Sequence, residues 1–173
     1  MMTFILKQIK SNENDVNWQD KHWQYELALF EWTLGQAFDS ADDNIFTEQH
    51  MSSISAEDWP ELKFILHSSV RRLDFEWNTV EMWQALTAET PTEVEAVKEE
   101  PSSWLIWREK LVTRFRSLQA DEKIALDTIR KGGSFNDVCE SHSFIMNEEE
   151  VPMHSASLLK AWITQGLIAD VVL

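Results

Sequence analysis

The sequence is poor in cysteine and in long apolar runs, and both absences limit what the chain can be. Its one cysteine is Cys139, so an intrachain disulfide is excluded and the composition fits a reducing compartment. No apolar stretch reaches the length of a membrane span. The N-terminal run Phe4-Ile5-Leu6 lacks the basic leading region and the length of a signal peptide. We therefore expect a cytoplasmic protein that does not enter a membrane.

Basic side chains are also scarce. The chain has 15 Lys and Arg against 30 Asp and Glu, a net charge of −15. The imbalance is uneven: residues 1–102 have 7 basic and 20 acidic side chains, residues 103–131 have 7 and 4, and residues 132–173 have 1 and 6. An acidic surface repels phosphate backbones and attracts cationic partners such as basic peptides. Solubility alone explains the same charge equally well.

Glycine and proline are few, with four of each, while there are nine tryptophans and nine phenylalanines. This composition predicts a packed core that needs no disulfide or metal. The one stretch with little to bury is residues 87–101, which are rich in glutamate and contain two prolines. We expect an acidic linker there, between a helical partner-binding domain at 1–86 and a second domain at 102–173.

In the first domain the apolar residues change their spacing along the chain. Aromatic and leucine side chains recur at helical spacing and predict a helix over about 17–38. Alternation predicts strands near 62–66 and 73–77, although the first stretch also fits a short helix. Asn78, followed three residues later by Glu81, predicts the start of another helix.

The second domain has the pattern of two strands followed by helices. Residues 104–107 and 113–116 predict strands, and an apolar stripe predicts a helix that stops at Gly132-Gly133. Ser134 then caps a short helix, a third helix begins near Val151-Pro152, and a last strand over 167–172 fits the pattern. The expected fold class is α+β and mostly α, with a winged-helix-like, peptide-recognition-element-like C-terminal domain of order β-β-α-α-α.

Few residues suggest chemistry, and we expect neither a catalytic residue nor a metal on this chain. Cys139 and His142 are three apart, so both could face one metal, but a buried thiol beside a surface histidine explains them as well. His67 precedes Ser68-Ser69, which fits either a catalytic dyad or a histidine in a turn.

The basic strands of the second domain allow two interpretations. Four cations lie on or beside these strands: Arg108, Lys110, Arg114 and Arg116. A winged helix with basic strands fits a DNA-binding transcriptional regulator, but the third helix has Lys160 as its only basic residue. Peptide capture needs only an unpaired strand edge beside an apolar helix face. The candidate peptide contacts are Leu111, Thr113, Phe115 and Trp162, with Leu158 nearby, although each also fits a core.

Several spaced stretches resemble one known family. They are Asp58–Arg71 with Trp77 and Trp83, then Trp104–Arg108, Arg114–Leu118, Gly133–Phe135 and Leu159–Trp162 with Gly166 and Leu167. The pattern is similar to the family long catalogued as a DNA-binding domain, of the HvfC, BufC and MbnC type. The resemblance covers most of the chain from about residue 18. The chain departs from it at Ser68, where the family usually has proline, and in its shorter N-terminal helices, which favour the methanobactin-type members.

The resemblance implies a function for the chain as a partner subunit. Members of this family assist multinuclear non-heme iron oxidative enzymes, which convert cysteines of ribosomally made precursor peptides into copper-binding oxazolone–thioamide groups, as in methanobactin. It implies that the iron is on the partner enzyme, that the two chains form a heterodimer, and that the C-terminal domain binds the peptide leader. The weaker candidates for contact with the enzyme are Arg71, Arg72, Trp77 and Trp83. A DNA-binding regulator and a small metal-binding protein using Cys139 and His142 remain alternatives.

Overall fold

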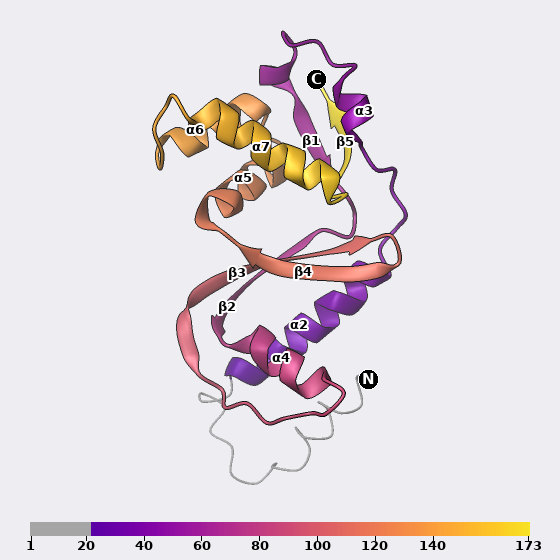
Figure 1. Ribbon diagram of the computed structural model, residues 1–173, viewed down its shortest axis with the longest axis vertical. Coiled ribbons are helices and arrows are strands. Elements are labelled where there is room, and N and C mark those ends of the chain that lie inside the picture. The colour runs from indigo at the N-terminus through magenta and orange to yellow at the C-terminus, as the bar shows by residue number, and fades with distance from the viewer. Residues whose placement is uncertain (1–21) are drawn as a thin grey trace.

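The computed structural model describes residues 22–173 (Figure 1). The run at Phe4-Ile5-Leu6 and the first residues of the helix predicted over 17–38 lie outside the described part. The elements are α2 (His22–Phe38), α3 (Glu48–Met51), the 3₁₀ turn η2 (Trp59–Glu61), β1 (Lys63–Leu66), β2 (Arg71–Trp77), α4 (Thr79–Thr87), β3 (Lys98–Glu109), β4 (Val112–Leu118), α5 (Ala120–Arg130), α6 (Phe135–Ser143), α7 (Val151–Thr164) and β5 (Ile168–Val172). The predicted α+β class is confirmed.

A three-stranded antiparallel sheet of order β2-β3-β4 lies between two helical layers (Figure 1). The register pairs Arg71 with Ile106 and Ile106 with Phe115. The tight turn between β3 and β4 consists of Lys110 and Leu111, and Lys110 has a φ of 56°. Because β3 pairs with β2 on one side and with β4 on the other, it lies in the middle of the sheet and β4 lies at one edge.

The two faces of the sheet support separate cores because side chains alternate along each strand. On one face, Phe75 and Ile106 pack against Phe30 of α2 and Val80 of α4. On the other face, residues such as Leu105 pack with α5, α6 and α7. Each fully buried large apolar side chain contributes roughly 1.5–3 kcal/mol relative to its exposed state. The sheet is therefore held from both sides, and the orientation of β4 is fixed.

A second antiparallel sheet pairs β1 with β5, and Phe64 lies opposite Val171. The main chain of neighbouring segments covers part of its margins. The amide of Phe46 donates to the carbonyl of Ile168 at 3.0 Å, and the amide of Phe135 donates to the carbonyl of Leu62 at 2.8 Å. This sheet joins residues from the first half of the chain to its last residues.

The predicted division into domains at 87–101 does not match the strand pairing. β2 pairs with β3 and β1 pairs with β5, so strands from both sides of the expected linker share sheets. Lys98 lies opposite Trp77, which makes the last residues of the expected linker part of β3. The N-terminal half also contains β1 and β2 and is not a purely helical domain. The predicted order of two strands, three helices and a last strand after residue 101 is confirmed.

The turn between α5 and α6 follows its sequence signals closely. Gly132 adopts a φ of 83° directly after α5, a conformation that favours glycine. Ser134 then accepts a hydrogen bond from the amide of Asp137 at 3.3 Å, and the amide of Ser134 donates to the Asp137 carboxylate at 2.7 Å. This reciprocal cap confirms the predicted start of α6. Among the helices described, none is long and apolar enough to cross a membrane.

Candidate functional site

The outer edge of β4 is an open edge of the central sheet. Within residues 22–173, no main-chain group pairs with β4 on the side away from β3. A two-residue turn makes Glu109 and Val112 a hydrogen-bonded pair, and the pattern then alternates along the hairpin. The N–H and C=O groups of Thr113, Phe115 and Ser117 therefore point outward from the sheet.

An independent contact agrees with this alternation. The amide of Arg108 donates to the hydroxyl of Ser69 at 3.0 Å, on the β2 side of β3. Arg108 lies directly opposite Thr113 in the register. Its amide therefore turns away from β4, as expected of a pair that shares no main-chain hydrogen bond. The outward direction of the Thr113 main chain follows from the same pairing.

The opposite edge of the sheet is partly closed by a carboxylate. The amides of Glu76 and Trp77 on β2 donate to the side chain of Glu26 at 3.0 and 3.3 Å. The hydroxyl of Thr79 donates to the same carboxylate at 2.8 Å. An acidic side chain on exposed amides protects an edge from pairing with another chain. The contacts of Glu26 make this end of β2 a poorer acceptor of a guest strand than β4.

One face of the open edge is aromatic. Phe115 lies half-buried among Phe30, Trp83 and Trp104, with ring centroids 5.3, 5.6 and 6.3 Å away. The hydroxyl of Thr113 points the same way and donates to the carbonyl of Leu34 at 3.4 Å. The side chain of Phe115 thus belongs to the core, as the simpler interpretation predicts, while its main chain faces outward.

The other face of the edge is cationic. Arg116 donates to both oxygens of Glu122, at 2.5 and 2.7 Å, and to the side chain of Gln165 just after α7. Its guanidinium also lies 5.9 Å from the ring centroid of Trp107. Arg114 pairs with Glu109 on the adjacent strand at 3.1 Å. These contacts place the C-terminal end of α7 above β3 and β4.

Two of the candidate peptide contacts have opposite environments. Leu111 lies in the hairpin turn and is 78% exposed, so it is available to a partner. Trp162 has an exposed fraction of 0%, and its indole N–H donates to Glu122 at 2.6 Å. The prediction that Trp162 contacts a peptide is therefore wrong, because the side chain is enclosed in the core. Leu158 packs at the margin of that core.

The candidates for contact with an enzyme are mostly occupied within the chain. Arg72 donates to both carboxylate oxygens of Asp127 at 2.6 Å, and Arg71 donates to the carbonyl of Ser68 at 2.6 Å. Trp77 and Trp83 are half-buried. The indole nitrogen of Trp83 is buried and has no hydrogen-bond partner among the residues that the structure describes. These contacts explain both arginines without a partner.

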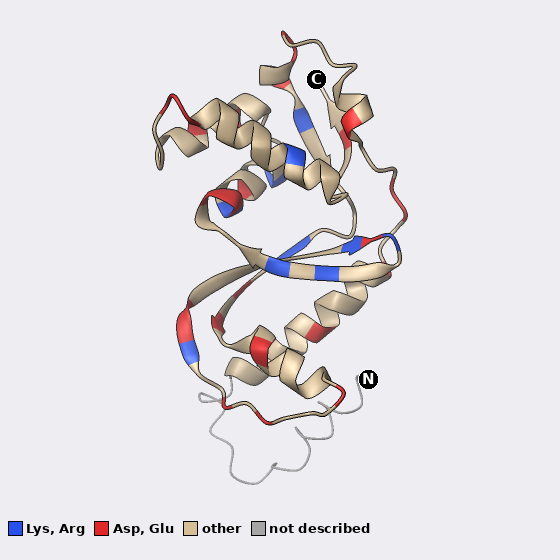
Figure 2. Ribbon diagram, viewed as in Figure 1, with Lys and Arg blue, Asp and Glu red and all other residues tan. Residues whose placement is uncertain are grey.

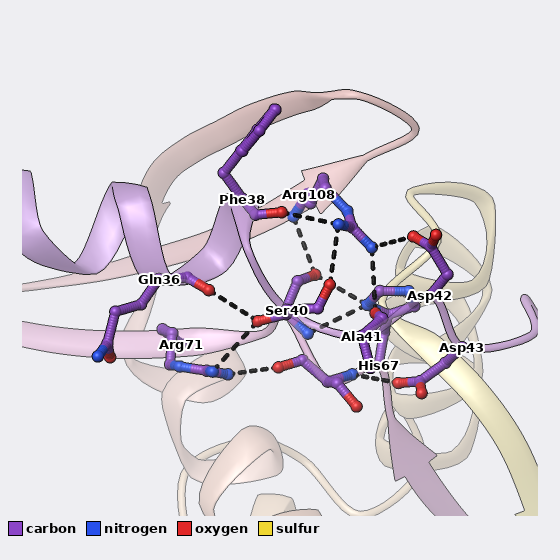
Figure 3. Close-up of polar contacts among 11 residues, drawn as sticks. Gln36, Phe38, Ser40, Ala41, Asp42, Asp43, His67, Arg71 and Arg108 are labelled. Carbon is purple, nitrogen blue, oxygen red and sulfur yellow. Dashed lines mark hydrogen bonds and ion pairs between the residues drawn. The ribbon is translucent and has the colours of Figure 1, made fainter.

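A clasp around Arg108, which the sequence does not reveal, positions α2 beside the hairpin (Figure 3). The guanidinium donates to the carbonyls of Phe38, Ser40 and Ala41 at 2.7, 2.9 and 3.0 Å and pairs with Asp42. These carbonyls belong to the end of α2 and the loop after it, where acceptors have no partner within the helix. The clasp thus fixes the end of α2 against the end of β3, next to the hairpin turn.

The turn at His67 is held by hydrogen bonds within the chain. The amide of Ser69 donates to Nδ1 of His67 at 3.1 Å, and the hydroxyl of Ser69 lies 2.8 Å from the same nitrogen. Burial lowers the pKa of His67, which favours the neutral ring. Hydrogen bonding from Ser68, including its amide at 2.5 Å, lowers the pKa of Asp43. His67 and Ser69 are 5% and 0% exposed, so a substrate has little access to the pair.

The metal alternative has few ligands to use. His142 is buried, with Nδ1 2.8 Å from the hydroxyl of Ser155 and Nε2 3.1 Å from the carbonyl of Asp121. A metal shared with Cys139 would have to displace one of these bonds. Across residues 22–173, no three His, Cys, Asp or Glu side chains are grouped so as to hold a metal ion.

Comparison with models of protein families, with curated proteins and with solved structures finds no match to this chain. The role of the β4 edge therefore has to be inferred from its own geometry and charge. Among the described residues it combines an open main chain, an aromatic face and a cationic face in one place.

Proposed function

We propose that the chain is a non-catalytic partner subunit of an iron-dependent peptide-modifying oxidase, and that it holds a precursor peptide in the cytoplasm. The observation that supports this most directly is the open outer edge of β4, where Thr113, Phe115 and Ser117 direct their main-chain groups outward. A peptide adds to such an edge as a further antiparallel or parallel strand. The chain itself makes and breaks no covalent bond in this scheme.

The edge offers a guest strand both hydrogen bonds and side-chain contacts. Each main-chain hydrogen bond contributes about 0.5–1.5 kcal/mol after the loss of bonds to water. A few such bonds give weak binding, so side-chain contacts must supply the rest of the affinity and the specificity. Leu111 at the turn and the neighbouring Val112, 78% and 49% exposed, provide apolar surface at one end of the edge. The cationic face lies beside them.

The reaction is assigned to the partner through the family resemblance. In the proposed heterodimer, the oxidase holds the iron and converts cysteines of the ribosomally made precursor into oxazolone–thioamide groups, as in methanobactin. The subunit described here binds the leader, which keeps the cysteines near the iron. The net charge of −15 favours a leader that is basic overall.

We propose that α2 contacts the oxidase, because it has large exposed aromatic side chains. Tyr25 and Trp32 on α2 are 68% and 54% exposed, and large exposed aromatics mark the centres of protein interfaces. They lie on the helix that also packs against Trp83 through Phe30. We therefore prefer α2 with Trp77 and Trp83 over Arg71 and Arg72, whose side chains are held within the chain.

Replacing Thr113 with proline tests the strand addition. Proline lacks the outward N–H, and edge strands tolerate it because that N–H is not used within the sheet. We expect the affinity for the precursor peptide, measured by calorimetry in the complex with the oxidase, to fall about tenfold, which corresponds to about 1.4 kcal/mol.

Thr113→Val is the matched control, because it keeps the N–H and removes only the hydroxyl contact to Leu34. It should bind the peptide nearly as well as the unchanged chain. Equal affinity of the proline and valine variants would contradict the use of the β4 edge.

A further inference from the structure

The open edge strand β4 has basic side chains, although the molecule as a whole is acidic (Figure 2). Residues 103–131 have 7 basic and 4 acidic side chains, whereas the whole chain has a net charge of −15. The cations of β4 itself are Arg114 and Arg116, and both project from the face toward α7. A guest strand attracted by the acidic surface thus meets positive charge at its final position.

The two arginines of β4 differ in how far their charge is already used. Arg116 is held by both oxygens of a largely buried carboxylate, that of Glu122, and by Gln165. Arg114 reaches Glu109 only through Nε, and these two side chains are 53% and 44% exposed. Its terminal guanidinium nitrogens have no partner among residues 22–173. Arg114 is therefore the arginine of β4 whose terminal N–H groups can donate hydrogen bonds to a guest peptide.

The pleat of the sheet determines which guest residue Arg114 can reach. Residues directly opposite each other in an added strand have side chains on the same face. The guest residue opposite Arg114 thus lies on the cationic face. The guest residues opposite Thr113 and Phe115 lie on the aromatic face, near Trp83.

Resting on the proposed function, we propose that Arg114 selects a guest strand with one carboxylate at the residue opposite it, between two apolar residues, in a peptide that is otherwise basic or neutral. The preference for a basic or neutral peptide and the preference for one carboxylate act over different distances. The net negative charge acts over several ångströms of solvent and disfavours further acidic residues. The guanidinium of Arg114 acts at hydrogen-bond distance and accepts a bidentate carboxylate. A single charged contact of this kind fixes the register of the added strand.

Selection from a displayed library of random peptides, long enough to pair with the seven residues of β4, tests this proposal. The unchanged chain should enrich peptides with Asp or Glu between apolar residues, and Arg114→Glu should enrich Lys or Arg at that position. Arg114→Gln should enrich neither charge. It serves as a second variant in case Arg114→Glu weakens the hairpin by placing a second carboxylate beside Glu109. For an enriched peptide, changing its carboxylate to lysine should weaken binding about fivefold.

Arg130→Glu is the matched control, since Arg130 is exposed on the last turn of α5, away from the edge. It should select the same peptides as the unchanged chain, and thermal melts confirm that each variant is folded. Enrichment with no charge preference, or a preference that Arg114→Glu leaves unaltered, would overturn the role of Arg114 and leave strand addition standing. Enrichment of no peptide by the folded chain would overturn strand addition and this inference with it.

Discussion

At the scale of single residues, the interior uses polar partners that an apolar pattern does not reveal. Glu122 is largely buried at the start of α5, where sequence alone places an acidic residue at a solvent-facing helix end. Its carboxylate accepts hydrogen bonds from Trp162 and from Arg116. The charged partner and the second donor offset the free-energy cost of removing this carboxylate from water. This triad joins α5, α7 and β4.

The burial of Trp162 can be predicted from the spacing of apolar residues in the sequence. The buried positions of α7 include Val151, Ser155, Leu159 and Trp162, which follow one another at helical spacing. That spacing assigns Trp162 to the inner face and could have excluded it from a binding surface. The exposure of Leu111 fits its position in a turn. No local pattern predicts the partners of Arg108, because its acceptors lie 66 to 70 residues earlier in the chain.

His67 gives a prediction for the pH dependence of stability. Burial lowers its pKa below the ordinary value of 6.5, and Nδ1 accepts from the amide of Ser69 only while it is unprotonated. Below pH 6.5 the unfolded chain binds a proton at this position that the folded chain resists, so the free energy of unfolding falls as the pH drops from 7.5 to 5.5. The loss at pH 5.5 is at most about 1.4 kcal/mol.

His67→Asn removes this titration and retains a side-chain acceptor for the amide of Ser69. Urea unfolding at the two pH values should show a smaller loss in the variant than in the unchanged chain. Identical losses would show that His67 has the same proton affinity in both states. The lowered pKa of Asp43 also makes stability fall at acidic pH, and its largest cause, the hydrogen bonding from Ser68, is the same in both proteins.

At the scale of helices and strands, the sequence patterns predict the elements well and their partners poorly. The alternation near residues 62–66 and 73–77 predicts β1 and β2, and Ser134 predicts the start of α6. The pairing of β1 with β5 joins segments about a hundred residues apart, and no local signal encodes it. The expected linker fails for the same reason, since Lys98 is in a strand only through its pairing with β2.

Replacing two glycines with alanine should change the free energy of unfolding in opposite directions. Gly35 lies within α2, and an added Cβ would meet nothing within 4 Å. At Gly133 an added Cβ would lie 2.7 Å from Cγ2 and 2.9 Å from the carbonyl oxygen of Thr128. Gly35→Ala should raise the free energy of unfolding by about 1 kcal/mol through helix propensity. Gly133→Ala should lower it by about 1–3 kcal/mol through overlap in the α5–α6 turn.

Urea unfolding of both variants beside the unchanged chain measures these effects directly. A loss of stability on replacing Gly35 would indicate that the exposed side of α2 is covered by something in solution. No loss on replacing Gly133 would mean that the turn can relax by several tenths of an ångström.

At the scale of the whole molecule, one sheet with helices on both faces fixes the site. The Arg108 clasp (Figure 3) sets the end of α2 beside the hairpin. The contacts of Glu122 with Arg116 and Trp162 set α7 on the other face of the sheet. The edge of β4 therefore lies between two packed layers. An edge held in place by such packing suits strand addition, because the receiving chain has little conformational entropy to lose. The sequence predicts the two strands of this hairpin but not the layers that surround them.

Hydrogen exchange at individual amides of β4, followed by NMR, tests the open edge most directly. In the free chain, the amides of Thr113, Phe115 and Ser117 should exchange faster than those of Arg114 and Arg116, which pair with β3. Adding the best peptide from the library selection should slow exchange at the three outward amides and leave the two inward amides nearly unchanged. Slow exchange of all five amides in the free chain, or peptide-induced protection confined to other elements, would contradict the account.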